Sequence, residues 1–323
     1  MNLNNWKSIF DGFEKFKVLI VGDAMIDAYM WGNINRQSPE APIPIVDITK
    51  HEKRLGGAAN VAINIKALGA EPILCSVIGN DKDAFFQLMK KEGLSTEGIL
   101  TDDRKTTIKT RVISEGKHQL RIDEEDVFPI KNEDDFIKNT MALMVDVDVV
   151  IFQDYNKGVL TGKVVNALVT ESKRLDKLTL VDPKKDNYWS YKNVDLFKPN
   201  LNELNQISDN NIEATQIEEL IQEVSAQQQK LNAKYFMLTL SQFGIHIQDE
   251  NNSHRFPAFE RDVIDVSGAG DCVIATASLA LASRLSYENI AQLSNLAGGL
   301  SCEKVGVNPI EKENLLKEAN RLI

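Results

Sequence analysis

The amino-acid sequence predicts an α/β protein with three layers, in which helices cover both faces of a mainly parallel central sheet and a small β element forms a lid. From residue 146 onward, apolar segments of strand length alternate with amphipathic segments of helix length, which is the pattern of a parallel sheet with right-handed crossovers. Two earlier segments, about 31–50 and 106–124, lack this alternation and are expected to form one small sheet that could fold over a site as a lid. We therefore expect a single domain over residues 1–323.

The first element is an apolar run at residues 17–22 that ends in glycine, typical of a buried parallel strand. It carries Asp23 to the carboxyl edge of the sheet, and Asp27 lies four residues further on. Open parallel sheets bind ligands at that edge, so the two carboxylates are candidates to hold the hydroxyls of a polyol. A turn residue and a helix cap would use the same residue types.

The two lid segments are predicted to be β-structure. Three prolines exclude a helix from residues 31–49, so edge strands outside the main sheet are expected there. Residues 106–123 alternate about a Glu-Gly-Lys turn, which predicts a hairpin. Its cations Lys109, Arg111 and Arg121 could receive a substrate phosphate, or could line a solvated strand face.

A Gly-Gly-Ala-Ala-Asn sequence at 56–60 precedes an amphipathic helix at 61–68. Gly57 and its small neighbours allow a ligand to approach the backbone, and Asn60 offers both a donor and an acceptor. Tight helix packing would explain the glycines equally well. A further strand and helix follow, closed by Gly93.

In the second half of the chain, polar residues come directly after the strands predicted at 148–152, 178–181 and 194–198. Because the carboxyl ends of parallel strands meet at one edge of a sheet, these residues should converge beside Asp23. Single residues in such loops are usually structural, whereas several together indicate a ligand site. The candidates are Asp154, Lys157, Asp182, Lys184, Asn200 and Glu203.

The next strand, at residues 235–240, runs into a tight turn. Thr239, Ser241 and Gly244 in this turn could approach nucleotide phosphates, although a plain hairpin loop would use the same residue types.

Residues 263–271 read Val-Ile-Asp-Val-Ser-Gly-Ala-Gly-Asp and predict a strand end, a glycine turn and the start of a long helix. Gly268 and Gly270 let successive amides point at one spot above the helix start, where the helix dipole adds positive charge. This spot is a candidate anion site. Asp271 at its edge could accept a proton from an attacking hydroxyl, or could simply favour the first helical turn.

Composition excludes several classes of protein. The 323 residues are 43% hydrophobic, enough for one large core, and the net charge of -10 without a basic run argues against nucleic acid as a partner. Residues 1–16 lack the apolar segment of a secretory signal, and the longest apolar run, 273–282, falls well short of the roughly 20 residues of a membrane span. Three widely spaced cysteines are typical of a reducing compartment. We expect a cytoplasmic protein that binds no membrane.

Three motifs, in this order, resemble the signatures of the ribokinase-like (PfkB) sugar kinases: Gly56-Gly-Ala-Ala-Asn60, Asn200-Leu-Asn-Glu203 and Asp265-Val-Ser-Gly-Ala-Gly-Asp271. The resemblance covers essentially the whole chain. Five further segments are similar to the subgroup that acts on D-glycero-β-D-manno-heptose 7-phosphate, a precursor of lipopolysaccharide. These segments are residues 22–27, 36–44, 107–111, 154–158 and 182–184.

The resemblance implies transfer of the γ-phosphoryl group of ATP, with Mg²⁺, to the anomeric hydroxyl of heptose 7-phosphate, giving the 1,7-bisphosphate. It implies that Asp271 is the catalytic base and that Gly268, Ala269 and Gly270 form the anion hole. The residues expected on the ATP side are Asn200, Asn202, Glu203, Thr239, Ser241 and Gly244, with Glu203 facing Mg²⁺ through water. The residues expected to hold sugar hydroxyls are Asp23, Asp27, Gly57, Asn60 and Asp154, and the candidates for the substrate phosphate are Lys109, Arg111, Arg121 and Lys157.

The resemblance also implies a homodimer formed through the lid. Two alternatives stay open: a kinase for another sugar phosphate such as fructose 6-phosphate, and a non-catalytic sugar-phosphate sensor. The four histidines form no His-x-Gly-His pair, so adenylyl transfer is expected from a separate chain. The sequence departs from the subgroup at Ser267 and Cys272, where threonines are usual, at Gln153, where serine is expected, and at Leu240, where arginine is common.

Overall fold

The computed structural model describes residues 5–208 and 210–323 and confirms the predicted α/β class. A nine-stranded sheet runs through the body in the order β13-β12-β11-β10-β9-β8-β1-β4-β5. Its strands pair in parallel except at β12, which is antiparallel to both of its neighbours, β11 and β13. The strands are β1 (Lys17–Gly22), β4 (Glu71–Ile78), β5 (Ile99–Thr101), β8 (Val149–Gln153), β9 (Leu178–Asp182), β10 (Leu196–Phe197), β11 (Tyr235–Thr239), β12 (Ile245–Gln248) and β13 (Ser253–Phe256).

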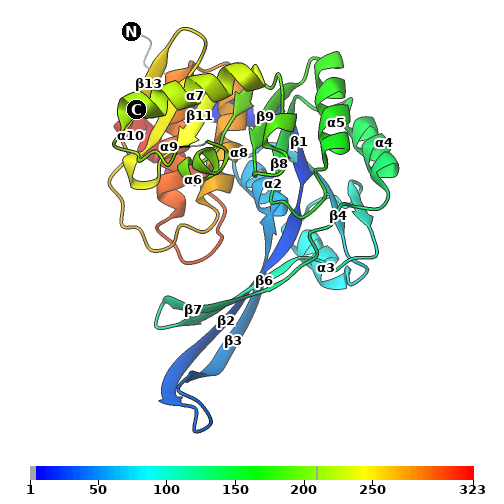
Figure 1. Cartoon of the computed structure of the whole chain (residues 1–323), viewed down its shortest axis with the longest axis vertical. Helices are drawn as coiled ribbons and strands as arrows, with labels where there is room; N and C mark the ends of the chain where they lie inside the picture. Colours follow the sequence, from blue (N-terminus) through cyan, green and yellow to red (C-terminus); the bar gives the residue numbers. More distant parts are fainter. Residues whose placement is uncertain (1–4, 209) are drawn as a thin grey trace.

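Helices cover both faces of this sheet, and each face has its own apolar core (Figure 1). One core is formed with α1 (Trp6–Gly12), α2 (Ala58–Ala67), α3 (Asp83–Glu92), α8 (Ala269–Ala282), α9 (Tyr287–Ser301) and α10 (Lys312–Leu322). The other is formed with α4 (Glu133–Met144), α5 (Gly162–Arg174), α6 (Leu201–Ile207) and α7 (Ile217–Leu231). The interior strand β1 explains the two cores, because its residues Val18 and Ile20 belong to one and Leu19 and Val21 to the other.

A second sheet of four strands extends away from the body (Figure 1). Its order is β3-β2-β6-β7, formed by β2 (Ala24–Gln37), β3 (Pro44–Gly57), β6 (Ile108–Ser114) and β7 (Lys117–Glu124). The two long strands begin and end closer to the body than the sequence indicated, because β2 starts immediately after Asp23 and β3 runs as far as Gly57. Asp27 therefore lies within β2 of the small sheet and not in a turn.

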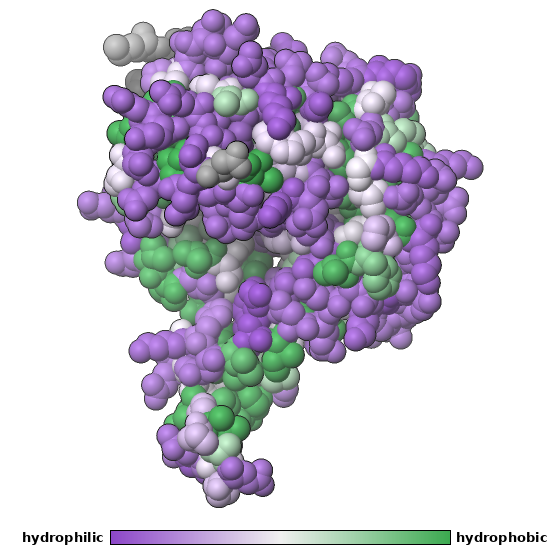
Figure 2. All heavy atoms as spheres, in the orientation of Figure 1, coloured by the Kyte–Doolittle hydropathy of each residue, from purple (hydrophilic) through white to green (hydrophobic). Residues whose placement is uncertain are grey.

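The small sheet leaves apolar side chains uncovered. Ile43, Ile48, Leu120 and Ile122 are all at least 38% exposed, and Figure 2 shows hydrophobic atoms gathered on this sheet, below the polar surface of the body. Isolated apolar side chains on a surface need no explanation, but a group of them on one sheet is typical of a contact surface. Among the described helices, none combines the length and the apolar character that a membrane crossing requires.

Candidate active site

The polar residues that follow the parallel strands meet at one edge of the large sheet, as the sequence predicts. The parallel register places Gly22 beside Gln153 and Gln153 beside Asp182. The amino end of α8 lies over the same edge, because a Cβ built on Gly270 would lie 3.7 Å from Oδ2 of Asp182 and 3.8 Å from Nζ of Lys198. The glycine motif and the strand-end carboxylates thus form one site.

The glycine turn opens α8 with unsatisfied amides. Gly268 precedes the helix with φ +80°, and a Cβ there would lie 3.0 Å from Nδ2 of Asn60, so only glycine suits the position. The amide of Ala269 donates to the carbonyl of Val266 at 3.2 Å. Within residues 5–208 and 210–323, the amides of Gly268, Gly270 and Asp271 have no acceptor. The candidate anion site therefore has three amides with no acceptor among the described residues, at Gly268, Gly270 and Asp271, while the amide of Ala269 is already used.

Asp271 is buried, at 3% exposed, in the first turn of α8. Its Oδ2 accepts a hydrogen bond from Nδ2 of Asn60 at 2.6 Å. Its Oδ1 accepts one from the hydroxyl of Tyr155 at 2.7 Å and one from Nε2 of Gln153 at 3.3 Å. Burial raises the pKa of Asp271 to about 7, although the bonds from Asn60 and Tyr155 act in the opposite direction. A carboxylate with such a pKa suits a general base at neutral pH.

Neighbouring charges are arranged in pairs. Asp182, which also raises the pKa of Asp271, is bound by Lys198 at 3.0 Å and by Nε2 of Gln153 at 3.1 Å. Gln153 thus bridges two buried carboxylates with one amide group. Its Oε1 is left without a partner in the described part of the chain.

The residues expected on the ATP side are placed around α6. Asn200 caps this helix, its Oδ1 accepting from the amide of Glu203 at 2.9 Å, while Oε2 of Glu203 accepts from the amide of Asn200 at 2.8 Å. The other oxygen of Glu203 pairs with Lys184. Burial tends to lower the pKa of Lys184, but Asp182 and Glu203 raise it, so this lysine stays charged.

The remaining ATP-side candidates differ in position. Asn202 and Ser241 are exposed. Thr239 forms a parallel backbone β-bridge with Asn200. Gly244 is buried with φ +88°, and a Cβ there would lie 2.0 Å from the carbonyl oxygen of Phe256. The turn between β11 and β12, which packs against the end of β13, therefore requires glycine at this position for a structural reason.

Both oxygens of Glu203 are engaged, so the carboxylate is placed to face a metal only through water. Among the described residues, no group of three or more His, Cys, Asp and Glu side chains could enclose a metal ion. This donor set fits Mg²⁺ held mainly by ATP phosphates and water, the usual mode for this ion.

The carboxylates expected to hold sugar hydroxyls have internal partners instead. Asp23 accepts from the amides of Tyr155, Lys157 and Val159 at 2.9 to 3.1 Å. Asp154 accepts from the amide of Asn156 and from the hydroxyl of Tyr191 at 2.8 Å each. Both are almost completely buried, and burial raises the pKa of each, to about 7 for Asp154. These bonds hold the loop after β8 in shape.

The other three residues of the expected sugar side also differ. Asp27 pairs with Arg111. Gly57 has φ +58°, and a Cβ there would lie 2.4 Å from the carbonyl oxygen of Asp23, so the backbone itself requires glycine. Asn60 alone lies against Asp271 at the motif.

The structure brings three of the four candidate phosphate-binding cations together, but each already has an acidic partner. Lys109 bonds to Asp123 at 3.1 Å and to Glu125 at 3.2 Å. Lys157 bonds to Glu125 at 2.7 Å, and Arg121 to Asp123 at 2.9 Å. The fourth, Arg111, is used by Asp27. Nothing in the sequence indicated the acidic partners of these four cations.

Sequence reasoning also missed Tyr155, Gln153 and Lys198 as members of the site. Tyr155 and Gln153 lie in and beside the loop that was singled out for Asp154 and Lys157, so their place after a strand was a usable signal. Lys198 comes directly after β10 of the same sheet, the kind of position at which the other site residues were found.

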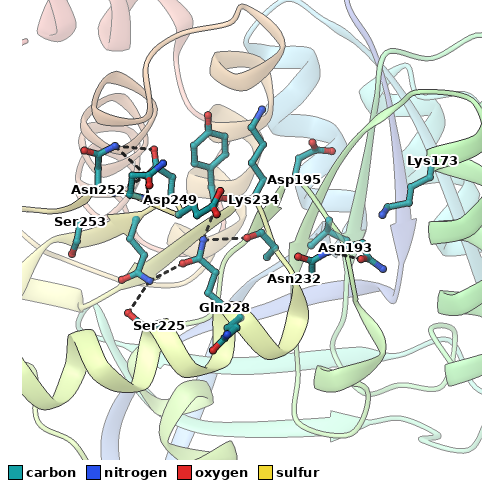
Figure 3. Close-up of a pocket in the computed structure, with 17 residues that line it drawn as sticks. Lys173, Asn193, Asp195, Ser225, Gln228, Asn232, Lys234, Asp249, Asn252 and Ser253 are labelled. Carbon is teal, nitrogen blue, oxygen red and sulfur yellow. Dashed lines mark hydrogen bonds between the residues drawn. The ribbon is translucent and has the colours of Figure 1, made fainter.

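A separate hollow of about 940 Å³ lies at the opposite edge of the sheet, beside the start of β11 (Figure 3). Its side chains bond mainly to one another: Nε2 of Gln248 donates to Ser225 at 3.2 Å and to Gln228 at 2.6 Å. None of the candidate site residues lines it. Its size therefore does not indicate the catalytic site.

Comparisons with known proteins show the family to which this chain belongs. Residues 15–314 match the family described as pfkB family carbohydrate kinase. The chain is 38% identical over 292 residues to the bifunctional protein HldE of Campylobacter fetus and 36% identical over 298 residues to that of Helicobacter pylori, in each case across 90% of this chain and 63% of the relative. The chain thus spans less than two thirds of the length of these relatives.

Solved structures share the fold. Phosphofructokinase-2 from Escherichia coli in complex with potassium has a TM-score of 0.78 at 18% identity, covering 95% of this chain and 99% of that one. Ribokinase from Arabidopsis thaliana, complexed with ribose and ATP, has a TM-score of 0.72 at 16% identity, covering 94% and 99%.

Proposed function

Because this chain belongs to the pfkB family of carbohydrate kinases, we propose that it phosphorylates D-glycero-D-manno-heptose 7-phosphate. The γ-phosphoryl group of ATP is transferred to the anomeric hydroxyl, and the product is the 1,7-bisphosphate. The general activity, a phosphotransferase with an alcohol acceptor, follows from the family. The choice of heptose is supported by the five subgroup segments and by the relatives named HldE.

The observation that supports the proposal most strongly is a buried carboxylate beside unsatisfied amides at the start of α8. Asp271 accepts the proton of the sugar hydroxyl as that oxygen attacks phosphorus, and the bond to the leaving oxygen of ADP breaks. The amides of Gly268 and Gly270 stabilise the charge on the transferred group. Asn60, bonded to Asp271, keeps the carboxylate in place.

Mg²⁺, when bound with ATP, supplies positive charge to the phosphates. Glu203 is the carboxylate of this chain that would face Mg²⁺ through water, while Lys184 pairs with Oε1 of Glu203. Asn200 and Thr239, bridged to each other, hold the backbone at that side of the site.

The substrate phosphate is proposed to bind between Lys109 and Lys157. Both lysines now share the carboxylate of Glu125, and their side chains are only 14% and 16% exposed. A phosphate carries more charge and more acceptor oxygens than a carboxylate, so it can replace Glu125 between the two ammonium groups.

The small sheet is proposed to cover the sugar and to pair two copies of the chain. Its uncovered apolar residues, Leu120 and Ile122 among them, support this role. Light scattering of the purified protein tests it, with a dimer mass expected for the wild type and a monomer mass for Leu120→Glu combined with Ile122→Glu. A wild type of monomer mass at micromolar concentration contradicts the dimer.

Adenylyl transfer to the product is proposed to take place outside residues 1–323. The reaction is proposed to be cytoplasmic, and the use of ATP as the phosphoryl donor supports this. The substrate itself is tested by measuring ADP release with heptose 7-phosphate, fructose 6-phosphate and ribose, and by identifying each product by mass. The heptose should give the highest kcat/KM and a bisphosphate. Higher activity on fructose 6-phosphate overturns the heptose assignment, and binding without ADP release indicates a sensor.

A further inference from the structure

Tyr155 and Gln153 are the site residues to which the proposed mechanism gives no role, although both bond to the base. Their two hydrogen bonds go to the same oxygen, Oδ1 of Asp271, at 2.7 and 3.3 Å. Oδ2 receives one bond, from Asn60 at 2.6 Å. A carboxylate oxygen has two lone-pair positions. Oδ1 is therefore saturated, and Oδ2 has one acceptor position left.

We propose that Oδ2 of Asp271 is the atom that takes the substrate proton, and that Tyr155 is a positioning residue that occupies Oδ1. This inference rests on the proposed function. The hydroxyl of the sugar donates to the free position on Oδ2, its proton moves to that oxygen, and the sugar oxygen forms the new bond to phosphorus. Tyr155 keeps its own proton throughout and touches neither substrate.

The surroundings of Tyr155 hold it in this position. Its amide donates to Asp23 at 2.9 Å, and Nζ of Lys184 lies 5.4 Å from the centre of its ring. Burial, followed by the charge of Asp271, raises the pKa of Tyr155 well above its usual value, so the hydroxyl remains a donor across the working pH range. Asp23 thus contributes to the site indirectly, because its carboxylate fixes the loop that carries Tyr155.

A hydrogen bond to the ionised form of a carboxylate favours that form. Removing the bond from Tyr155 should therefore make Asp271 harder to ionise. The other charged groups that face Asp271 are Asp182 of β9 and Asp27 of β2, which disfavour its ionisation, and Lys184, which favours it. None of these is changed by replacing Tyr155 with phenylalanine, so the tyrosine bond is the variable that the substitution isolates.

The test is the pH dependence of kcat/KM for Tyr155→Phe. The acid limb should move to higher pH by about one unit, because a hydrogen bond to a charged group is worth at least that much. Activity should fall about tenfold at the acid end and recover toward the wild-type value above pH 8. A role confined to folding would lower the rate equally at every pH.

Tyr191→Phe is the matched control. It removes the same kind of bond, from a buried tyrosine to a buried carboxylate, at 2.8 Å, but the acceptor is Asp154 and not the base. Its acid limb should coincide with that of the wild type. Gln153→Met removes the longer bond to Oδ1, together with the bond from Gln153 to Asp182, and should shift the limb in the same direction by less. It keeps the proposal testable should Tyr155→Phe fold poorly.

The outcomes separate this inference from the function on which it rests. An unshifted acid limb in both Tyr155→Phe and Gln153→Met, with Asp271→Asn inactive, overturns the inference and leaves the function standing. Full turnover by Asp271→Asn overturns both. A shift in Tyr155→Phe that is absent from Tyr191→Phe supports the positioning role of Tyr155 on Asp271, on which the assignment of Oδ2 depends.

Discussion

Replacing Gly270 with alanine should separate activity from stability. Gly270 is exposed in the first turn of α8, and its φ is not positive, so alanine fits the backbone. The new methyl group would make only ordinary contacts, at 3.7 Å to Asp182 and 3.8 Å to Lys198. It would nevertheless stand at the edge where the transferred phosphoryl group is expected to approach the amides.

The size of each effect follows from general magnitudes. Alanine within a helix is favoured over glycine by about 0.5–1 kcal/mol, which for a domain of this size raises Tm by about 2 °C. Displacing the phosphoryl group from a preorganised donor should lower kcat by about 100-fold. The variant should therefore be at least as stable as the wild type and much less active.

The assay combines thermal unfolding with ADP release under saturating ATP. Gly162→Ala is the control, because Gly162 also begins a helix, α5, and its new methyl would meet only Ser190, at 3.9 Å. This control should gain similar stability and keep wild-type kinetics. Wild-type kcat/KM in Gly270→Ala would refute the reasoning, since it would mean that no reacting group comes close to this amide.

Other predictions concern charge. Asp271→Asn should lose about 10²- to 10⁴-fold in kcat with its fold intact by circular dichroism; near-normal turnover contradicts the base assignment. Since Asp271 has a pKa of about 7, the wild-type kcat/KM should fall roughly tenfold per unit below pH 7, in an assay with buffers of constant ionic strength. Folding raises the pKa of Asp271 from 3.8, so between about pH 4 and pH 7 the folded protein retains a proton that the unfolded chain releases. In urea titrations, the free energy of unfolding of the wild type should therefore fall relative to that of Asp271→Asn as the pH rises from about 4 to about 7. Arg111→Ala leaves Asp27 buried without its partner and should cost about 3–5 kcal/mol in urea unfolding. Arg121→Ala, whose side chain is 59% exposed, should cost less than about 1 kcal/mol, and equal losses for the two arginines would contradict the burial argument.

The sequence predicts the fold and the centre of the site because both depend on local patterns. Alternating apolar segments are enough to indicate a parallel sheet, and the edge at which its strands end is fixed by topology. The glycine turn before Asp271 is likewise a property of adjacent residues. For these features, short-range spacing carries the information.

The internal partners could not be predicted in this way. Asp23 has the same residue type and the same strand-end position whether it holds a sugar or the amides of a distant loop, and its bonding partners lie more than 130 positions away. Lys109 and Lys157 likewise read as free cations until the fold brings Glu125 between them. Sequence spacing shows which groups reach an edge, but not which of their lone pairs and protons are already used.

The long strands of the small sheet connect the site with a distant end of the molecule. β2 has 14 residues, or roughly 45 Å at the usual rise, and it leaves the body directly after Asp23. Near the point where β2 leaves the body, the hydroxyl of Tyr29 accepts from the amide of Val307 at 2.9 Å, and Arg54 donates to the carbonyl of Val307 at 2.7 Å. The neighbouring amide of Gly306 donates to Asp265 of the glycine motif at 2.7 Å. A rotation of the small sheet by a few degrees about this point would move its far end by several ångströms. A partner bound at the far end would therefore act, through this rotation, on the geometry of the phosphoryl-transfer site.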